Sequence, residues 1–228
     1  MGLRSIGDMK NRNFNDIIQQ KKDYEYLQHI GEPIPKSKLI GKRSFDIIFG
    51  LVGFVISTPL ILVFGLIIKA TSPGPALFKQ ERVGYLGNNF YLIKLRSMRN
   101  DAESKTGAVW AQKNDPRVTP VGRLMRKTRI DELPQFWNVL VGNMSLIGPR
   151  PERPELTEKF YQKWPEFPQR LRIIPGITGY AQVNGGYDIS PGKKCHLDNY
   201  YIKNYSFLFD MKIALETVKI IITGDGAR

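Results

Sequence analysis

Two adjacent carboxylates, Asp131 and Glu132, have the setting in this chain that most suggests chemistry. Such a pair is often only the solvated start of a helix, where acidic side chains complement the helix dipole. Here, however, Arg126, Lys127 and Arg129 lie within the five residues before it, and an apolar stretch follows. Carboxylates surrounded by cations suit a divalent metal ion and a bound diphosphate. We therefore expect Asp131 and Glu132 to be catalytic.

Two further motifs carry cations that could bind phosphate groups. Arg150 lies between two prolines, and because proline fixes φ, little backbone freedom remains to be lost there on binding. A rigid guanidinium can hold a phosphate through two parallel hydrogen bonds, although a structural turn with an exposed arginine is the alternative. Lys94 and Arg96 form the other motif. We expect Lys94, Arg96, Arg126 and Arg150 to contact substrate phosphates.

The overall charge also indicates an anionic partner. The chain has 34 Lys and Arg against 21 Asp and Glu, a net charge of +13. Nucleic acid, anionic lipid headgroups and phosphorylated substrates all fit such a charge. The single cysteine, Cys195, excludes an intrachain disulfide, and the two distant histidines leave too few ligands for a Cys/His zinc site.

One long apolar segment determines whether the site lies beside a membrane or beside a buried protein core. The 22 residues from Ile47 to Ile68 carry no charge, and a straight helix of that length spans about 33 Å, enough to cross a hydrocarbon core. Pro59 lacks the N–H that a helix needs. We expect the helix to break there, with the hydroxyls of Ser57 and Thr58 satisfying the freed backbone groups.

Basic residues flank this segment on both sides, at Lys42, Arg43 and Lys69. Because basic flanks stay on the cytoplasmic side of a membrane, a broken helix that enters and returns would keep both flanks inside. We therefore favour a re-entrant helix. A kinked helix that spans the membrane and a buried helix of a soluble core are the alternatives.

The rest of the chain predicts an α+β fold. Short strands are expected over 76–84 and 88–98, with a polar loop over 101–117. Helices are expected over 14–30, 119–129, 133–140, 155–164 and 208–222. We divide the chain into a polar N-terminal surface arm (1–40), a re-entrant membrane helix (41–71) and a cytoplasmic catalytic domain (72–228). The whole is then a compact membrane-associated catalytic domain with one broken re-entrant membrane helix, surface amphipathic helices and a small sheet.

Several stretches together resemble the bacterial sugar transferase family, the monotopic phosphoglycosyl transferases. These stretches are Lys94 to Met98, then DPRVTPVGRLMRKTRIDELPQFWNVLVGNMSLIGPRPE, GITGYAQVNGG and LDNYYIKNYSFLFDMKI. The resemblance runs from about Lys42 to the C-terminus, and its central motif is long and ungapped. It implies a compact member without the four-helix membrane module of the long members. The family's Ser-Pro helix break corresponds here to Thr58-Pro59, with Ser57 one position earlier.

The resemblance also implies roles for the site residues. Asp131 matches the family nucleophile, which attacks a UDP-sugar and releases UMP, and Glu132 matches the Mg²⁺ ligand. Arg126 and Arg150 match phosphate-contacting positions. The implied acceptor is polyprenyl (undecaprenyl) phosphate at the bacterial inner membrane, with the catalytic domain on the cytoplasmic face, in contact with membrane lipid. A homodimer is compatible with this assignment.

The family handles several donor sugars, and the C-terminal stretch favours galactose or glucose. Two other functions compete with this one. A membrane-tethered nucleic-acid-binding protein would explain the charge, but no helix-turn-helix, zinc-finger or RNP pattern is present, so we expect no nucleic acid partner. A catalytically inactive membrane scaffold would keep the fold, but the intact Asp131–Glu132 pair argues against it.

Overall fold

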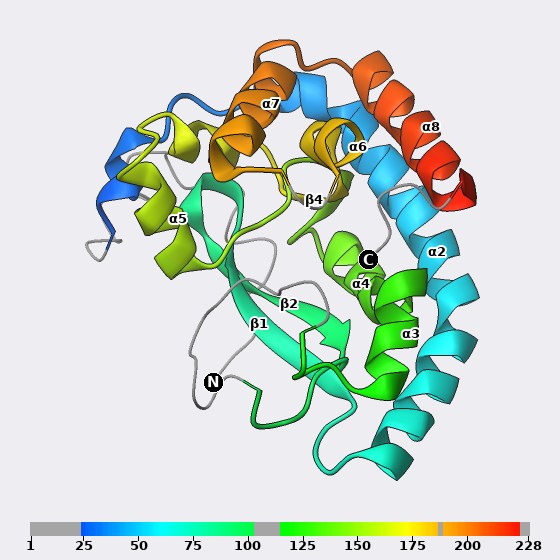
Figure 1. Ribbon diagram of the computed structural model, residues 1–228. Coiled ribbons are helices and arrows are strands. Elements are labelled where there is room, and N and C mark those ends of the chain that lie inside the picture. The colour runs from blue at the N-terminus through cyan, green and yellow to red at the C-terminus, as the bar shows by residue number, and fades with distance from the viewer. Residues whose placement is uncertain (1–23, 103–114, 187–188, 224–228) are drawn as a thin grey trace.

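Helices and short strands alternate in the computed structural model, which describes residues 24–102, 115–186 and 189–223 (Figure 1). The strands are β1 (Leu77–Val83), β2 (Asn89–Leu95), β3 (Ser145–Ile147) and β4 (Gly176–Thr178). The helices are α2 (Lys36–Thr71), α3 (Pro120–Thr128), α4 (Gln135–Leu140), α5 (Pro154–Tyr161), α6 (Tyr180–Gly185), α7 (Pro191–Lys203) and α8 (Phe207–Thr223). Short 3₁₀ helices cover Glu25–His29, Tyr85–Gly87, Ile130–Glu132 and Phe167–Arg172. Helices combined with two small sheets confirm the mixed class.

Strands β1 and β2, which the sequence predicted as two short strands, form an antiparallel hairpin. Phe78 lies opposite Lys94 in their register, and the 3₁₀ turn Tyr85–Gly87 joins the strands. Side chains alternate between the two faces of a strand. Phe78, Gln80 and Arg82 therefore share one face of the hairpin with Lys94.

Strands β3 and β4 form a second, parallel pair, with Ser145 opposite Gly176. The loop that follows β3 packs so closely on the chain before β4 that a Cβ on Gly148 would lie 2.4 Å from the carbonyl oxygen of Ile174. Beside this pair lies a core cluster of buried side chains: Ile34, Ile147, Ile173, Tyr201, Ile202, Tyr205 and Ile213. The sheet thus fixes the start of the loop that carries Arg150.

Helix α2 corrects the predicted break. It is helical from Lys36 to Thr71 and continues through Pro59, although Figure 1 shows that its axis bends. The hydroxyls of Ser57 and Thr58 both donate to the carbonyl oxygen of Phe54, at 3.1 and 2.7 Å, and not to that of Val55, which loses its partner to the proline. One missing hydrogen bond in a long helix therefore bends it without ending it.

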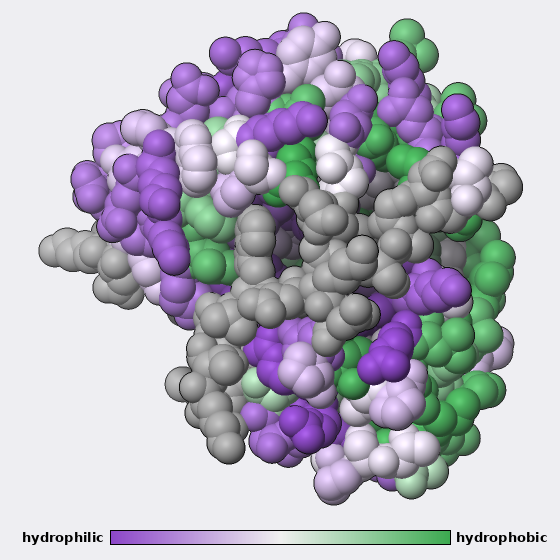
Figure 2. All heavy atoms as spheres, in the orientation of Figure 1, coloured by the Kyte–Doolittle hydropathy of each residue, from purple (hydrophilic) through white to green (hydrophobic). Residues whose placement is uncertain are grey.

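The apolar residues of α2 mostly face outward. Only 11% of its most apolar 18-residue window is buried, and Figure 2 shows hydrophobic side chains along the edge of the molecule that α2 follows. This exposure contradicts the alternative of a buried helix in a soluble core. Within the described residues, α2 is the one helix that is long and apolar enough to cross a membrane.

Part of the predicted N-terminal surface arm is buried. Tyr26, Leu27 and Ile30 pack against Val83, at the end of β1, and Leu86, within the turn of the hairpin. Burial of these apolar side chains outweighs the polar composition of their neighbours. Residues 1–23, which include most of the helix expected over 14–30, lie outside the described residues, and the described end of that helix is the 3₁₀ turn Glu25–His29.

The later helices agree closely with the predicted ranges. Helices α3, α4, α5 and α8 lie within three residues of the expected bounds. Ile130–Glu132 forms a separate 3₁₀ turn before α4. In α8, Ile213 is buried while Leu208 and Leu215 are exposed, as in a surface helix. Most of the predicted loop over 101–117 lies outside the described residues.

Candidate active site

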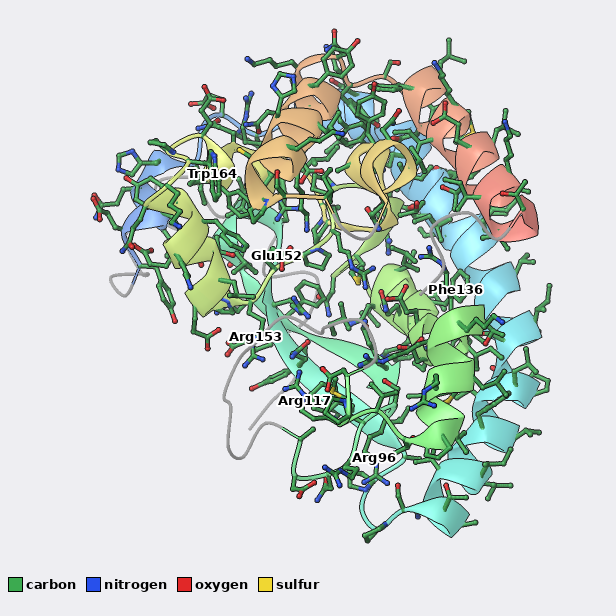
Figure 3. The ribbon with its side chains drawn as sticks, in the orientation of Figure 1. Arg96, Arg117, Phe136, Glu152, Arg153 and Trp164 are labelled. Carbon is green, nitrogen blue, oxygen red and sulfur yellow. The ribbon has the colours of Figure 1, made fainter. Side chains whose placement is uncertain are left out.

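A cavity of about 860 Å³ lies between the β1–β2 hairpin, helix α3, the loop after β3 and helices α6 and α8. One face of the hairpin forms a wall of it, through Phe78, Gln80, Arg82, Lys94 and Arg96. Its described lining is strongly basic, with the cations Arg82, Lys94, Arg96, Arg99, Arg117, Arg126, Arg129, Arg150, Arg153, Lys194 and Lys219 against the acids Asp131, Glu152 and Glu216. Figure 3 shows labelled Arg96, Arg117, Arg153 and Glu152 along this side of the hairpin. Such a lining attracts a polyanionic ligand.

Two local features place Asp131 in this cavity. Helix α3 packs against the end of β2 so closely that a Cβ on Gly122 would lie 1.9 Å from the carbonyl oxygen of Ser97. At the end of α3, Arg129 has a φ of +58°, a left-handed conformation that costs a non-glycine residue about 1 kcal/mol. This reversal turns the chain into the 3₁₀ turn Ile130–Glu132 and brings its buried Asp131 to the cavity.

Two cations hold Glu132. Lys94 Nζ donates to Glu132 Oε1 at 3.1 Å, and Arg150 Nη2 donates to the same oxygen. Although burial raises the pKa of Glu132, the charges of Arg150 and Lys94 hold it well below its usual range. Burial in turn lowers the pKa of Lys94, which the nearby Glu132 charge opposes. Glu132 is therefore ionised whenever the site is intact.

Asp131 has a different environment. Burial, followed by the neighbouring charge of Glu132, raises its pKa to about 6, while Lys94, Arg126 and Arg150 act in the opposite direction. Neither an ion pair nor a side-chain hydrogen bond engages its carboxylate within the described part of the chain. At neutral pH the group is thus an ionised, poorly solvated carboxylate facing a basic cavity, which is the state that a nucleophile or a metal ligand requires.

The predicted phosphate-binding cations are brought together, but they are engaged differently. Arg126 Nε donates to Ser97 Oγ at 2.9 Å, and its side chain lines the cavity. Arg96 is buried and donates to the carbonyl oxygens of Pro73 and Ser72, at 2.5 and 3.0 Å. Arg96 thus fastens the turn after α2, in addition to lining the cavity. The predicted helix-break residues, 57–59, do not line it.

A buried ionic network lies beneath Arg150, and the sequence did not predict it. Glu152 pairs with Lys194 of α7 and lies 3.5 Å from Arg82 of β1. Although burial raises the pKa of Glu152, the charges of Lys194, Arg82 and Arg170 lower it to about 2.

The same network holds the backbone of the Arg150 loop. Arg170 donates to the carbonyl oxygen of Arg150 at 2.6 Å, and Arg82 donates to that of Pro151 at 3.2 Å. Position next to the Pro-Arg-Pro motif could have singled out Glu152, but no sequence signal links it to Lys194.

The carboxylates of Asp131 and Glu132 are the donors present for the Mg²⁺ ion that the family resemblance implies. Among the described residues, no group of three or more His, Cys, Asp or Glu side chains could hold a metal ion by itself. Magnesium commonly binds one or two carboxylates and completes its coordination with water and substrate phosphates. The ionised pair beside a phosphate-attracting cavity therefore fits this mode of binding.

Comparison with known proteins shows the family of the chain. Residues 37–224 match the model of the family described as bacterial sugar transferase. The chain is 45% identical over 190 residues, 82% of its length, to the UDP-N-acetylgalactosamine-undecaprenyl-phosphate N-acetylgalactosaminephosphotransferase of Aeromonas hydrophila, and covers 45% of that protein. It is 40% identical over 203 residues, 86% of its length, to the UDP-glucose:undecaprenyl-phosphate glucose-1-phosphate transferase of Caulobacter vibrioides, and covers 76% of it.

A third relative is named for another sugar. The chain is 37% identical over 203 residues, 82% of its length, to the undecaprenyl-phosphate galactose phosphotransferase of Salmonella typhimurium, and covers 41% of that protein. The chain thus spans less than half the length of the Aeromonas and Salmonella relatives.

Proposed function

This chain belongs to the bacterial sugar transferase family, and we propose that it transfers a sugar-1-phosphate from a UDP-sugar to undecaprenyl phosphate, with release of UMP. The observation that carries the proposal is the Asp131 carboxylate, which is buried, ionised near neutral pH and free of ion pairs within the described residues, in a cavity lined by cations. The relatives named above are transferases to undecaprenyl phosphate, which supports the same acceptor here.

In the first step of the proposed mechanism, an Asp131 oxygen attacks the β-phosphorus of the UDP-sugar. The bond from that phosphorus to the bridging oxygen breaks, and the electron pair leaves with UMP. The product is an acyl phosphate that links Asp131 to the sugar. Lys94, Arg126 and Arg150 surround the position of the diphosphate and stabilise the charge that develops on its oxygens.

In the second step, an oxygen of the lipid phosphate attacks the same phosphorus, and the Asp131 carboxylate leaves. The lipid then carries a diphosphate-linked sugar, and the enzyme is regenerated. Both substrates are anionic, so they repel each other in a direct transfer. With a covalent intermediate, they bind to the basic site one after the other. Glu132 would hold Mg²⁺ together with substrate oxygens, and the ion would neutralise diphosphate charge.

We further propose that α2 anchors the enzyme at the bacterial inner membrane, with the cavity on the cytoplasmic face. The exposed apolar surface of α2 supports this arrangement, as does the lipid tail of the proposed acceptor. The basic cavity also contains the Asp131 carboxylate, and phosphorylated substrates explain that combination better than a nucleic acid does.

The decisive experiment tests the covalent step. Purified enzyme given UDP-sugar and Mg²⁺ without lipid should release a burst of UMP of about one per active site, and intact-mass analysis should show a sugar-phosphate adduct that undecaprenyl phosphate removes. Asp131→Asn should give neither burst nor adduct. An inactive scaffold would release no UMP at all, and an adduct that maps to Glu132 would contradict the assigned roles.

The donor sugar can be read from the same assay. UDP-galactose and UDP-glucose, which the sequence favours, belong in the panel together with UDP-N-acetylgalactosamine, for which the Aeromonas relative is named. The substrate is the donor that gives the fastest adduct formation. EDTA should abolish the burst with each donor and Mg²⁺ should restore it, whereas full activity in EDTA would contradict a metal role for Glu132.

A further inference from the structure

One end of the cavity differs in charge from the rest. Residues of helices α6 and α8 line this end. Both helices lie away from β1 in Figure 1. The cations described above come mainly from the hairpin, α3 and the loop after β3. By contrast, α8 contributes one lysine and one glutamate, Lys219 and Glu216, and α6 contributes the uncharged Ala181, Gln182, Val183 and Asn184. The α6–α8 end is therefore suited to an uncharged part of a ligand.

At this end of the cavity, the side-chain oxygen of Gln182 accepts no hydrogen bond from the described residues. Its Nε2 donates to the carbonyl oxygen of Ile177 at 2.7 Å, which fixes the orientation of the amide. Its Oε1 is buried and has no hydrogen-bond partner within the described part of the chain. An unsatisfied buried acceptor costs about 1–3 kcal/mol. Gln182 lines the cavity, so a ligand that reaches its amide can supply the missing donor and relieve that cost.

The chemistry of a UDP-sugar restricts what that donor can be. Its phosphates are ionised diesters at neutral pH and offer acceptors only. The donors are the N3–H of uracil, the hydroxyls of the ribose and the transferred sugar, and the amide N–H of an N-acetylated sugar. An amide oxygen at the α6–α8 end cannot recognise the diphosphate, but it can accept a hydrogen bond from the uridine or the glycosyl moiety.

We propose that Gln182 binds the uncharged, organic part of the donor substrate by accepting a hydrogen bond at Oε1, a role that rests on the proposed function. The diphosphate then lies among Lys94, Arg126 and Arg150, and the donor extends towards α6 and α8. Gln182 is in this view a substrate-recognition residue that lies outside the Asp131–Glu132 motif.

The test compares three ligands on two variants by calorimetry in detergent. Gln182→Met keeps the side-chain volume but removes both the acceptor and the donor to Ile177. It should weaken UDP-sugar binding at least tenfold and leave pyrophosphate binding within twofold of wild type. The UMP arm identifies the donor group, because UMP weakens with the UDP-sugar only if uridine is the part recognised.

Gln169→Met is the matched control. Gln169 also donates from Nε2 to a backbone carbonyl, that of His29, at 2.7 Å, but it lies outside the cavity, and its loss should not change UDP-sugar affinity. The proposal is overturned if Gln182→Met binds UDP-sugar as wild type does, or if its pyrophosphate binding weakens equally. Wild-type enzyme that neither binds UDP-sugar nor releases UMP would instead refute the proposed function.

Discussion

Two neighbouring carboxylates, Asp131 and Glu132, are held in different states by their surroundings. Glu132 is fixed by Lys94 and Arg150, which lower its pKa, while burial raises the pKa of Asp131. The environment thus separates a permanently charged partner from a group that can react. Residue types and spacing predicted this pair and its cations. The division of roles depends on which oxygen each cation reaches, and therefore on the tertiary structure.

The raised pKa of Asp131 predicts a pH dependence of the first step. Only the ionised carboxylate attacks phosphorus, so the rate of UMP release in a single turnover should be constant above about pH 7 and should fall tenfold per pH unit below about pH 6. Rapid-quench measurements from pH 4.5 to 8 would check this. A rate that does not change between pH 5 and 8 would contradict Asp131 as the nucleophile.

The same pKa predicts that Asp131→Asn stabilises the fold. A buried carboxyl with a raised pKa favours its protonated form, so its ionisation at pH 7.5 destabilises the native state by about 3 kcal/mol. Removing that charge should raise Tm by roughly 5–10 °C in thermal unfolding. The gain should fall to about half at pH 5 and nearly vanish at pH 4, where Asp131 is protonated in the folded protein.

Glu132→Gln is the control of opposite sign. A carboxylate whose pKa is lowered stabilises the fold above its unfolded-state pKa, and that stabilisation is lost as the pH falls through the folded-state value. The variant should therefore have a lower Tm than wild type at pH 7.5. Shifts of the same sign for both variants would refute the assigned environments.

At the scale of elements, the ionic network around Glu152 connects β1, α7 and the Arg150 loop. Glu152→Gln leaves Lys194 buried without its partner, so the free energy of unfolding should fall by about 3 kcal/mol. The loop that carries Arg150 should also loosen, and UMP release should slow. Adding Lys194→Met should recover part of the stability, with a coupling of about 1–3 kcal/mol in a double-mutant cycle.

Glu155→Gln offers a surface pair for comparison. Glu155 is largely exposed and lies 3.6 Å from Arg153, so its loss should change the free energy of unfolding by less than about 1 kcal/mol. Equal losses for Glu152→Gln and Glu155→Gln would show that burial of the network contributes nothing. Denaturant unfolding in a fixed detergent would measure both variants.

Glycines in α2 set the distance to α4, the helix that follows the catalytic pair. A Cβ on Gly53 would lie 2.5 Å from the ring of Phe136, whereas one on Gly65 would meet only the Cβ of Ala76, at 3.8 Å. Gly53→Ala should therefore displace α4 and slow UMP release at least tenfold. Gly65→Ala should be neutral or slightly stabilising, because alanine favours a helix. Similar activities for the two variants would refute close packing as the constraint.

The elements that the sequence predicted are those with local signals. The hairpin has alternating residues and a turn at Tyr85–Gly87, and α3 and α8 have helical spacing. The predictions failed where contacts between residues far apart in the sequence determine the structure. Burial of Tyr26 depends on the hairpin turn, and the pair of Glu152 with Lys194 joins segments 42 residues apart. The rule that proline interrupts a helix predicted a break at Pro59. That rule considers only the local sequence, whereas the rest of the chain supports α2 along its length.

At the scale of the whole molecule, one domain holds both ends of α2. Near its start, Lys42 donates to Asp210 of α8 at 3.0 Å, and Arg43 donates to backbone carbonyls at the end of α4. Beyond its end, Arg96 donates to Ser72 and Pro73. A helix that crossed a membrane would place these two sets of contacts on opposite sides, so we propose an arrangement in which α2 bends, dips into the lipid and returns.

This arrangement predicts the accessibility of both flanks of α2 in intact cells. Single cysteines at Lys38 and Thr71, in a Cys195→Ser background, should both resist a membrane-impermeant thiol reagent and should both react after permeabilisation, because both positions are exposed in the fold. Labelling of only one position in intact cells would instead identify a spanning helix. Pro59→Leu removes the residue that interrupts the hydrogen bonds, and the apolar segment is long enough to cross a bilayer. We expect the straightened helix to span the membrane in a fraction of the molecules. In intact cells, one flank of α2 should then be labelled in that fraction.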